Sequence, residues 1–330
     1  MNLKKIGLTA LAGSLVATSV FAGEMTVTGS ASMKVEHVNG GNANAGKSWS
    51  MGNQLEFAGS GELDNGLTVS LNMVLDQNDD KTTTAPTAAT GWNTGTPFDS
   101  HSVSVSSDAL GTLVFHGEGG SSAQGAIDTT AAGDIWDSSF GITAAQDPKA
   151  SAMSDNAIFY TLPTLMDGVA LTTSYSPKGT GVESSQAYGL GYTGVEGLTV
   201  NYALGEDNSA VKTVDVTTMK ATYAYGPITI GYSDTEYDSQ DTATTVDQDV
   251  TSYNVSYTVS DSISVSYGSE EISQPNDSTD QDIEVDGITA SYTTGGMTIS
   301  GTMIDADNTA HGTTVTEDKQ QWSLAASFAF

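Results

Sequence analysis

Carboxylates on one long connection are the residues of this sequence best placed to do chemistry. The connection spans residues 119–155, has Glu118 at its root, and carries aspartates whose charges could act together: Asp128, Asp134, Asp137 and Asp147. A ring of carboxylates at a narrowing attracts cations and repels anions. Connections this long in a compact domain are commonly functional, and apolar residues such as Trp136 let this one pack against a wall. Two placements are open at this point: a loop folded inward, where its carboxylates would act together, and a solvated external loop.

Catalytic and metal-binding patterns are weak by comparison. The histidines are scattered without the spacing of a metal site, and the chain has no cysteine. No Gly-x-Ser-x-Gly sequence is present, and the glycines around Glu118 lack the lysine and the helix of a phosphate loop. The sequence therefore predicts no catalytic residues, no enzyme activity, no cofactor and no bound metal.

Composition narrows the remaining classes of protein. The 330 residues contain 40 acidic side chains against 10 lysines and no arginine, a net charge of −30. Nucleic-acid binding needs a basic surface against the phosphates, so this charge argues against a nucleic-acid partner. Serine, threonine, glycine and asparagine dominate, yet valine, isoleucine and aromatic residues recur regularly. That combination is typical of β-structure and not of a disordered chain.

The first 22 residues have the pattern of an export signal. Lys4 and Lys5 precede an apolar stretch at 6–20, and Ala22 is a small residue at a cleavage position. Polar residues interrupt the stretch, which is also shorter than the ~20 residues of a membrane-spanning helix. Cleavage after Ala22 would leave one domain, residues 23–330, with a charge of 8 − 40 = −32.

Apolar and polar residues alternate with period two along most of this domain. Met25, Val27 and the odd positions that follow share one apolar face, and the pattern recurs from Leu67, Met219 and Ile288 onward. Such runs are strands with one apolar and one polar face. The sequence offers no second set of apolar positions, such as helices, to cover so much one-sided sheet.

The connections between these strands alternate between short and long. Seven are tight turns rich in Gly, Asn, Asp or Pro, and eight are long, so together they join sixteen strands. The mature chain gives 308/16, about 19 residues per strand and connection, which suits tilted membrane strands of about 9–11 residues. Short turns at one end and long loops at the other are typical of membrane barrels. We therefore predict an all-β fold, a transmembrane antiparallel β-barrel of about 16 strands with a water-filled lumen.

Strand parity places a few charges inside the predicted barrel. Lys34, Glu56, His116 and Lys220 lie on polar faces, and a charge facing lipid near the bilayer midplane would cost about 2–4 kcal/mol. The two lysines and the histidine are expected to oppose the acidic loop; a position at the rim without a specific role is the alternative for each. Aromatic residues fall near strand ends on the apolar face, as an interfacial girdle requires: Tyr223, Tyr225, Tyr232, Tyr257, Tyr267, Tyr292, Trp322 and Phe328.

With these features, the sequence resembles the general porins of Gram-negative outer membranes, especially the alphaproteobacterial type. The opening residues 24–29 resemble the family's first strand, and residues 112–117 resemble the strand that leads into the constriction loop. The closing residues resemble the C-terminal signature read by the assembly machinery, marked by Trp322, Phe328 and Phe330. The resemblance implies a homotrimer in the outer membrane that passes small hydrophilic solutes and ions passively, with the connection at residues 119–155 folded inward as the constriction loop. It also implies contact with membrane lipids and lipopolysaccharide.

The absence of arginine departs from the family, which commonly sets arginines on the wall against carboxylates on the third loop. Lysines supply point charges but not a rigid fork. We expect a passive channel that favours cations weakly. Two alternatives stay open: a substrate-selective outer-membrane channel with a site in the constriction, and a secreted acidic β-adhesin. The adhesin is the least favoured, since it would need neither the aromatic C-terminus nor long loops at one end only.

Overall fold

The computed structural model describes residues 25–39, 46–77, 98–127, 131, 148–153, 155–177, 183–208, 213–240, 247–275, 281–309, 311 and 318–330. Within them the strands are β1 (Met25–Asn39), β2 (Gly46–Glu62), β3 (Thr68–Gln77), β4 (Ser100–Ser107), β5 (Gly111–Glu118), β6 (Ala157–Thr161), β7 (Val169–Ser176), β8 (Ser185–Val195), β9 (Leu198–Glu206), β10 (Val214–Tyr225), β11 (Ile228–Ser239), β12 (Gln248–Ser260), β13 (Ile263–Ser273), β14 (Ile283–Thr294), β15 (Met297–Asp307) and β16 (Lys319–Ala329).

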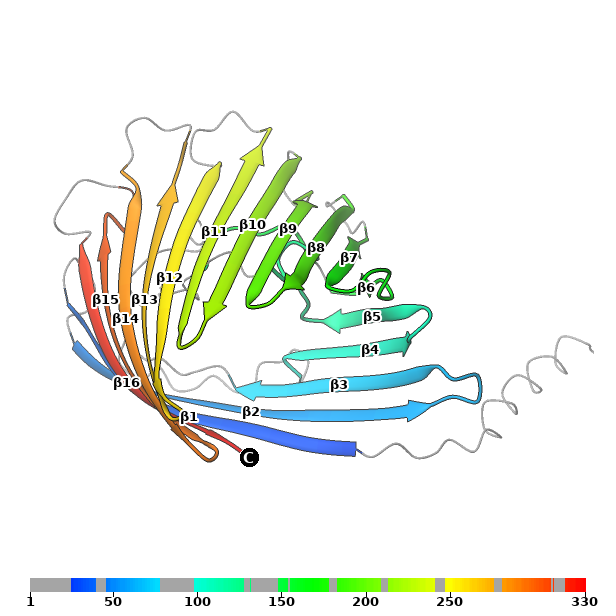
Figure 1. Cartoon of the computed structure of the whole chain (residues 1–330), viewed down its shortest axis with the longest axis horizontal. Helices are drawn as coiled ribbons and strands as arrows, with labels where there is room; N and C mark the ends of the chain where they lie inside the picture. The colour runs from blue at the N-terminus through cyan, green and yellow to red at the C-terminus, as the bar shows by residue number, and fades with distance from the viewer. Residues whose placement is uncertain are drawn as a thin grey trace, which may run out of the picture.

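These strands form one closed barrel. Each strand pairs antiparallel with its neighbours in sequence, and β1 pairs with β16 to complete the ring (Figure 1). The predicted all-β barrel of sixteen antiparallel strands is confirmed. Among the residues that the structure describes, no helix is long and apolar enough to cross a membrane.

The tight turns all lie at one end of the barrel because each joins an even-numbered strand to the next odd-numbered one. Several contain a glycine with left-handed backbone, such as Gly197 with φ +76° between β8 and β9. A Cβ at Gly197 would also lie only 2.3 Å from the carbonyl oxygen of Ala224 near the end of β10, so this turn has room for glycine alone. The long connections join the strands at the opposite end.

The seam between β1 and β16 is closed by the last residue of the chain. The Gly29 N–H donates to the Phe330 carbonyl at 2.8 Å, and the Phe330 N–H donates to the Gly29 carbonyl at 2.9 Å. The aromatic ring of Phe330 lies against Gly29, where a Cβ would come within 2.5 Å of the ring. The terminal aromatic residue of the predicted signature therefore fits a position that a glycine leaves open.

The two faces of the barrel wall differ as the alternation predicts. One face carries exposed large apolar and aromatic side chains, and its predicted girdle residues Tyr223, Tyr225, Tyr257, Tyr267, Tyr292 and Trp322 are exposed. The other face is rich in serine, threonine and glycine and includes Ser174, Thr218 and Ser252. Because large apolar side chains cover the first face, the second is the interior of the barrel.

Toward the long-loop end of β10–β15 the polarity of the two faces reverses. A buried apolar cluster occupies the interior face there and consists of Val250, Ile272, Ile283, Val285, Ile304 and Ala306. Carboxylates occupy the outer face, as in Glu284 and Asp286 of β14, which are exposed between buried Ile283, Val285 and Gly287. The period of two continues without interruption, so the reversal comes from residue type alone.

Candidate functional site

The described parts of the long connection between β5 and β6 lie along the interior wall. The Ala123 N–H donates to Ser174 Oγ of β7 at 2.9 Å, and the Ala131 N–H donates to Ser252 Oγ of β12 at 3.0 Å. On the way back, the Lys149 N–H donates to Gln248 Oε1 of β12 at 2.8 Å. Hydrogen bonds from backbone to wall thus reach from β7 to β12.

Small residues on β8 and β9 let the connection approach the wall closely. A Cβ at Gly205 would lie 2.3 Å from Ser151 Oγ, and a Cβ at Gly189 would lie 3.1 Å from the Ala123 carbonyl oxygen. Ala187 and Ala203, on the same interior face, are buried. Two limbs of the connection therefore pack against these small residues: the outgoing limb (residues 119–127) and the returning limb (residues 148–153). Larger side chains on β8 and β9 would fill the space that the limbs occupy.

Lys149 on the returning limb is held by an aromatic ring and by carboxylates. Its Nζ lies 4.9 Å from the centre of the Tyr237 ring, and the Tyr237 hydroxyl donates to Asp207 Oδ2 at 2.8 Å. Burial lowers the pKa of the Lys149 amine, whereas the charges of Asp247 and Asp207 act to raise it. A cation–π contact of this kind contributes about 0.5–2 kcal/mol and helps to hold the limb on β11.

His116 and Glu118 shape the root of the outgoing limb. The His116 ring lies on the interior row of β5, and its Nδ1 is 3.0 Å from the carbonyl oxygen of Gly119. Gly119 has left-handed backbone with φ +64°, which turns the chain out of the strand. The Glu118 carboxylate lies 3.9 Å from His101 Nδ1 of β4. In these contacts both residues serve the geometry of the turn.

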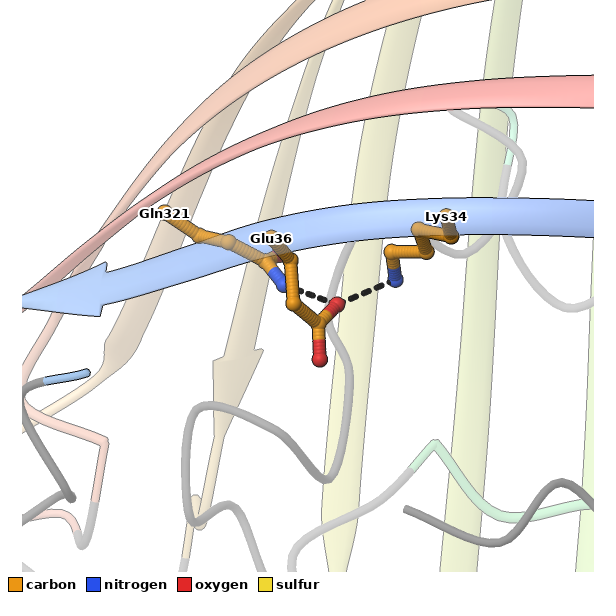
Figure 2. Close-up of polar contacts among 3 residues, drawn as sticks. All are labelled: Lys34, Glu36 and Gln321. Carbon is orange, nitrogen blue, oxygen red and sulfur yellow. Dashed lines mark hydrogen bonds and ion pairs between the residues drawn. The ribbon is translucent and has the colours of Figure 1, made fainter. Parts of the chain in front are cut away.

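Lys34 has a partner that sequence reasoning missed. Its Nζ lies 2.5 Å from Glu36 Oε2, and Gln321 Nε2 of β16 donates to the same oxygen at 3.0 Å. Figure 2 shows both nitrogens reaching one carboxylate oxygen from opposite sides. Glu36 is 5% exposed. This ion pair lies within β1, and its signal was available, since residues i and i+2 of a strand share one face. The expected opposition of Lys34 to the acidic loop stays a prediction, because the loop aspartates lie outside the described residues.

Each of the other predicted residues lies either on the barrel wall or outside the residues that the structure describes. Glu56 accepts a short hydrogen bond from Asn72 Nδ2 across β2 and β3. Lys220 lies on the interior row of β10, two residues beyond Thr218. The loop aspartates of the prediction lie outside the described residues: Asp128, Asp134, Asp137 and Asp147. Among the residues that are described, no cluster of three His, Asp or Glu side chains could hold a metal ion.

Much of the acidic charge on the strands lies outside the barrel wall. We call the outward-facing carboxylates of β9–β15 the acidic arc; its members are Glu206, Asp215, Asp234, Glu236, Asp238, Asp249, Glu271, Glu284, Asp286, Asp305 and Asp307. The interior rows of the described strands carry fewer charges, among them Lys34, Glu36, Glu56, Lys220, Glu270 and Lys319. Net charge alone therefore overstates the negative charge of the lumen.

The sequence matches the Gram-negative porin family over residues 7–285, which is most of its length. The chain belongs to this family. Solved porins share its fold: a triple mutant of the Rhodopseudomonas blastica porin is 16% identical, with a TM-score of 0.64 over 93% of this chain and 100% of its own. An anion-selective porin from Comamonas acidovorans is also 16% identical, with a TM-score of 0.67 over 93% of this chain and 99% of its own. No curated protein matches the sequence significantly.

As a porin, the protein is a channel of the outer membrane. Its exposed apolar face meets lipid, with tyrosines at the level of the interface, and its polar face lines the channel. The long connection between β5 and β6 enters this channel along the wall of β7–β12. Its described limbs therefore lie inside the barrel, against that wall.

Proposed function

We propose that this porin passes small hydrophilic solutes by passive diffusion with a weak preference for cations. The observation that carries the proposal is the loop described above, seated by hydrogen bonds on a polar interior wall in a barrel wide enough to hold water. Serine, threonine and amide side chains on the interior rows supply donors and acceptors without a strong charge of either sign. Such a lining suits many small solutes and selects no single one.

The preference for cations rests on the carboxylates that face the lumen. A porin of the same fold from Comamonas acidovorans is described as anion-selective, so the sign of selectivity comes from side chains and not from the barrel itself. Glu56 on the wall and the loop aspartates Asp128, Asp134, Asp137 and Asp147 would attract cations. Salt screens exposed charges beyond about 8 Å, so the acidic arc on the outer face contributes less.

Reversal potentials in planar bilayers under a tenfold salt gradient test this preference. The wild-type protein should give a cation-directed potential, and Glu56→Gln should move it toward zero, since the amide oxygen keeps the contact with Asn72 but loses the charge. Glu284→Gln is the matched control because it removes the same charge from the outer face. An anion-directed wild-type potential, or a larger effect at Glu284 than at Glu56, would contradict the proposal.

Assembly into a homotrimer is proposed through the outer face of β1–β5, which we call the apolar arc. Met33 and Met51 are register partners there and are exposed, as is Trp49. Among the described residues of these strands, no tyrosine and no outward carboxylate interrupts the apolar arc, in contrast to β9–β15. A surface that carries large apolar side chains without tyrosines or outward carboxylates fits another protein surface better than a lipid headgroup layer.

Native mass spectrometry of charge variants tests the trimer. Met51→Lys should convert trimers to monomers, whereas Met303→Lys, a substitution of an equally exposed methionine on β15, should leave the trimer intact. Loss of the trimer in both variants, or in neither, would place the interface elsewhere.

Export is proposed through removal of residues 1–22. The N-terminal residue of protein purified from outer membranes should then be Gly23, because Ala22 supplies the small residue before the cleavage site. A mature protein that begins at Met1 would contradict the predicted signal peptide.

A further inference from the structure

Gln124 joins both limbs of the constriction loop to the barrel wall. Its side chain is 0% exposed. Its Nε2 donates to Thr218 Oγ1 of β10 at 2.7 Å, and its Oε1 accepts from the Ser151 N–H of the returning limb at 2.6 Å. One amide group therefore connects three parts of the chain: the outgoing limb, the returning limb and the wall.

The contacts around Gln124 form a connected set. Thr218 Oγ1 lies 2.9 Å from Thr235 Oγ1 of β11, so the wall side of the link continues into the next strand. Ser122 Oγ lies 2.5 Å from Ser151 Oγ and also accepts from the Gly125 N–H at 2.8 Å. The two limbs thus contact each other beside Gln124. They do so next to Gly205 of β9, where an added Cβ would lie 3.1 Å from the Gln124 Cβ.

The position requires an amide with the reach of glutamine. The wall hydroxyl receives a donor and the limb N–H needs an acceptor, and the carboxamide of glutamine offers these two groups on separate atoms at the end of its side chain. Glutamate would keep the acceptor and lose the donor, while leucine would keep the volume and lose both. Because all the groups are buried, a lost partner is not replaced freely by bulk water.

We propose that Gln124 is the positioning residue that fixes the two limbs against the wall and thereby sets the width of the channel. The proposal rests on the channel function proposed above. Leaving a buried hydrogen-bonding group without its partner commonly shifts an equilibrium by a factor of about 5–150. Loss of the amide should therefore raise the population of displaced limbs by about that factor, and each open channel should carry a current that fluctuates more.

Single-channel recording of three variants tests the role of Gln124. Gln124→Ala should increase the width of the open-channel current distribution several-fold. Thr218→Val should increase it less, because it removes the hydroxyl contacts with Gln124 and Thr235 but leaves the link between Gln124 and Ser151 and keeps the side-chain volume. Gln320→Ala is the control, since this glutamine lies exposed on the outer face of β16. Urea unfolding of each variant separates loss of positioning from loss of barrel stability.

A disulfide supplies the second arm of the experiment. The chain has no cysteine, so Ser122→Cys with Ser151→Cys in the Gln124→Ala protein introduces the only pair, at positions whose hydroxyl oxygens are 2.5 Å apart. Oxidation should restore the narrow wild-type current, and reduction should broaden it again. This arm also answers the case in which Gln124→Ala folds poorly, because the oxidised protein retains the link between the limbs.

The outcomes distinguish failure of the proposed role of Gln124 from failure of the proposed channel function. Wild-type currents in Gln124→Ala and Thr218→Val, even with lowered stability, would show that Gln124 is merely structural and would overturn the proposal. An oxidised pair that leaves the broadened current unchanged would also overturn it. Folded wild-type protein without channels would instead remove the proposed function itself.

Discussion

Replacing Gly29 by alanine should weaken the seam between β1 and β16. A Cβ at this position would lie 2.5 Å from Cε2 and 2.8 Å from Cζ of the Phe330 ring, and 3.0 Å from Cδ2 of Leu55. Ordinary contact begins near 3.4 Å, so the ring must move by 3.4 − 2.5 = 0.9 Å. It must do so while the backbone of Phe330 stays bonded to Gly29 through two hydrogen bonds.

The matched control for this substitution is Gly59→Ala on β2. Gly59 faces outward as Gly29 does, and nothing lies within 4 Å of the position of its Cβ. Alanine in place of a strand glycine stabilises by about 0.5–1 kcal/mol through the unfolded chain, and this gain is common to both sites. Overpacking costs about 1–3 kcal/mol and applies at Gly29 alone. The difference in unfolding free energy between the two variants should therefore be about 1–3 kcal/mol.

Urea unfolding of protein folded into lipid vesicles measures this difference, with tryptophan fluorescence and gel mobility as two readouts. A Phe330→Leu background provides the double-mutant cycle, since removal of the planar ring should make Gly29→Ala nearly as mild as Gly59→Ala. Equal effects at the two glycines, or a penalty at Gly29 that persists in Phe330→Leu, would refute the proposed packing of the terminal ring.

Further predictions concern charge and the constriction loop. Lys34→Met should destabilise the barrel by about 1–3 kcal/mol because it removes the ionic partner of a buried carboxylate, and Glu36→Gln should cost less in the same unfolding assay. The acidic arc sets like charges opposite one another, as in the register pair Glu271 and Glu284, so magnesium should raise the melting temperature and chelation should lower it. Glu271→Gln with Glu284→Gln should reduce that dependence; a dependence that is unchanged would locate the repulsion elsewhere. Tyr237→Leu should weaken the contact that holds Lys149 by about 0.5–2 kcal/mol and should widen the distribution of single-channel currents, as Gln124→Ala does. A distribution as narrow as that of the wild type would limit the Tyr237 ring to a packing role.

The architecture of the barrel was accessible from the sequence because each strand carries its own signal. Alternation with period two marks the strands, and glycine-rich turns mark one end, so neither feature depends on distant parts of the chain. The interior assignment of Lys34 and Lys220 followed from the same parity.

The contacts of the site were less accessible because they join residues far apart in sequence. Gln124 lies in a run of small polar residues without periodicity, and its importance emerges only when Thr218 and Ser151 are brought beside it. The pairing of Lys34 with Glu36 was readable from their shared face, but the burial of Glu36 depends on Gln321 of β16. The distribution of carboxylates between the two faces of the wall does not follow from net charge, because net charge counts both faces together.

The acidic arc has a consequence for how these molecules share the plane of the membrane. Two barrels that approach each other through β9–β15 would bring rows of carboxylates within a Debye length of about 8 Å, and they would repel. Approach through β1–β5 meets no such charge on the described outer face. A crowded membrane of this porin would therefore hold particles whose contacts are directional, with lipid filling the spaces that the charged sides keep open. Spacing between neighbours in such a lattice should shrink as the salt concentration rises.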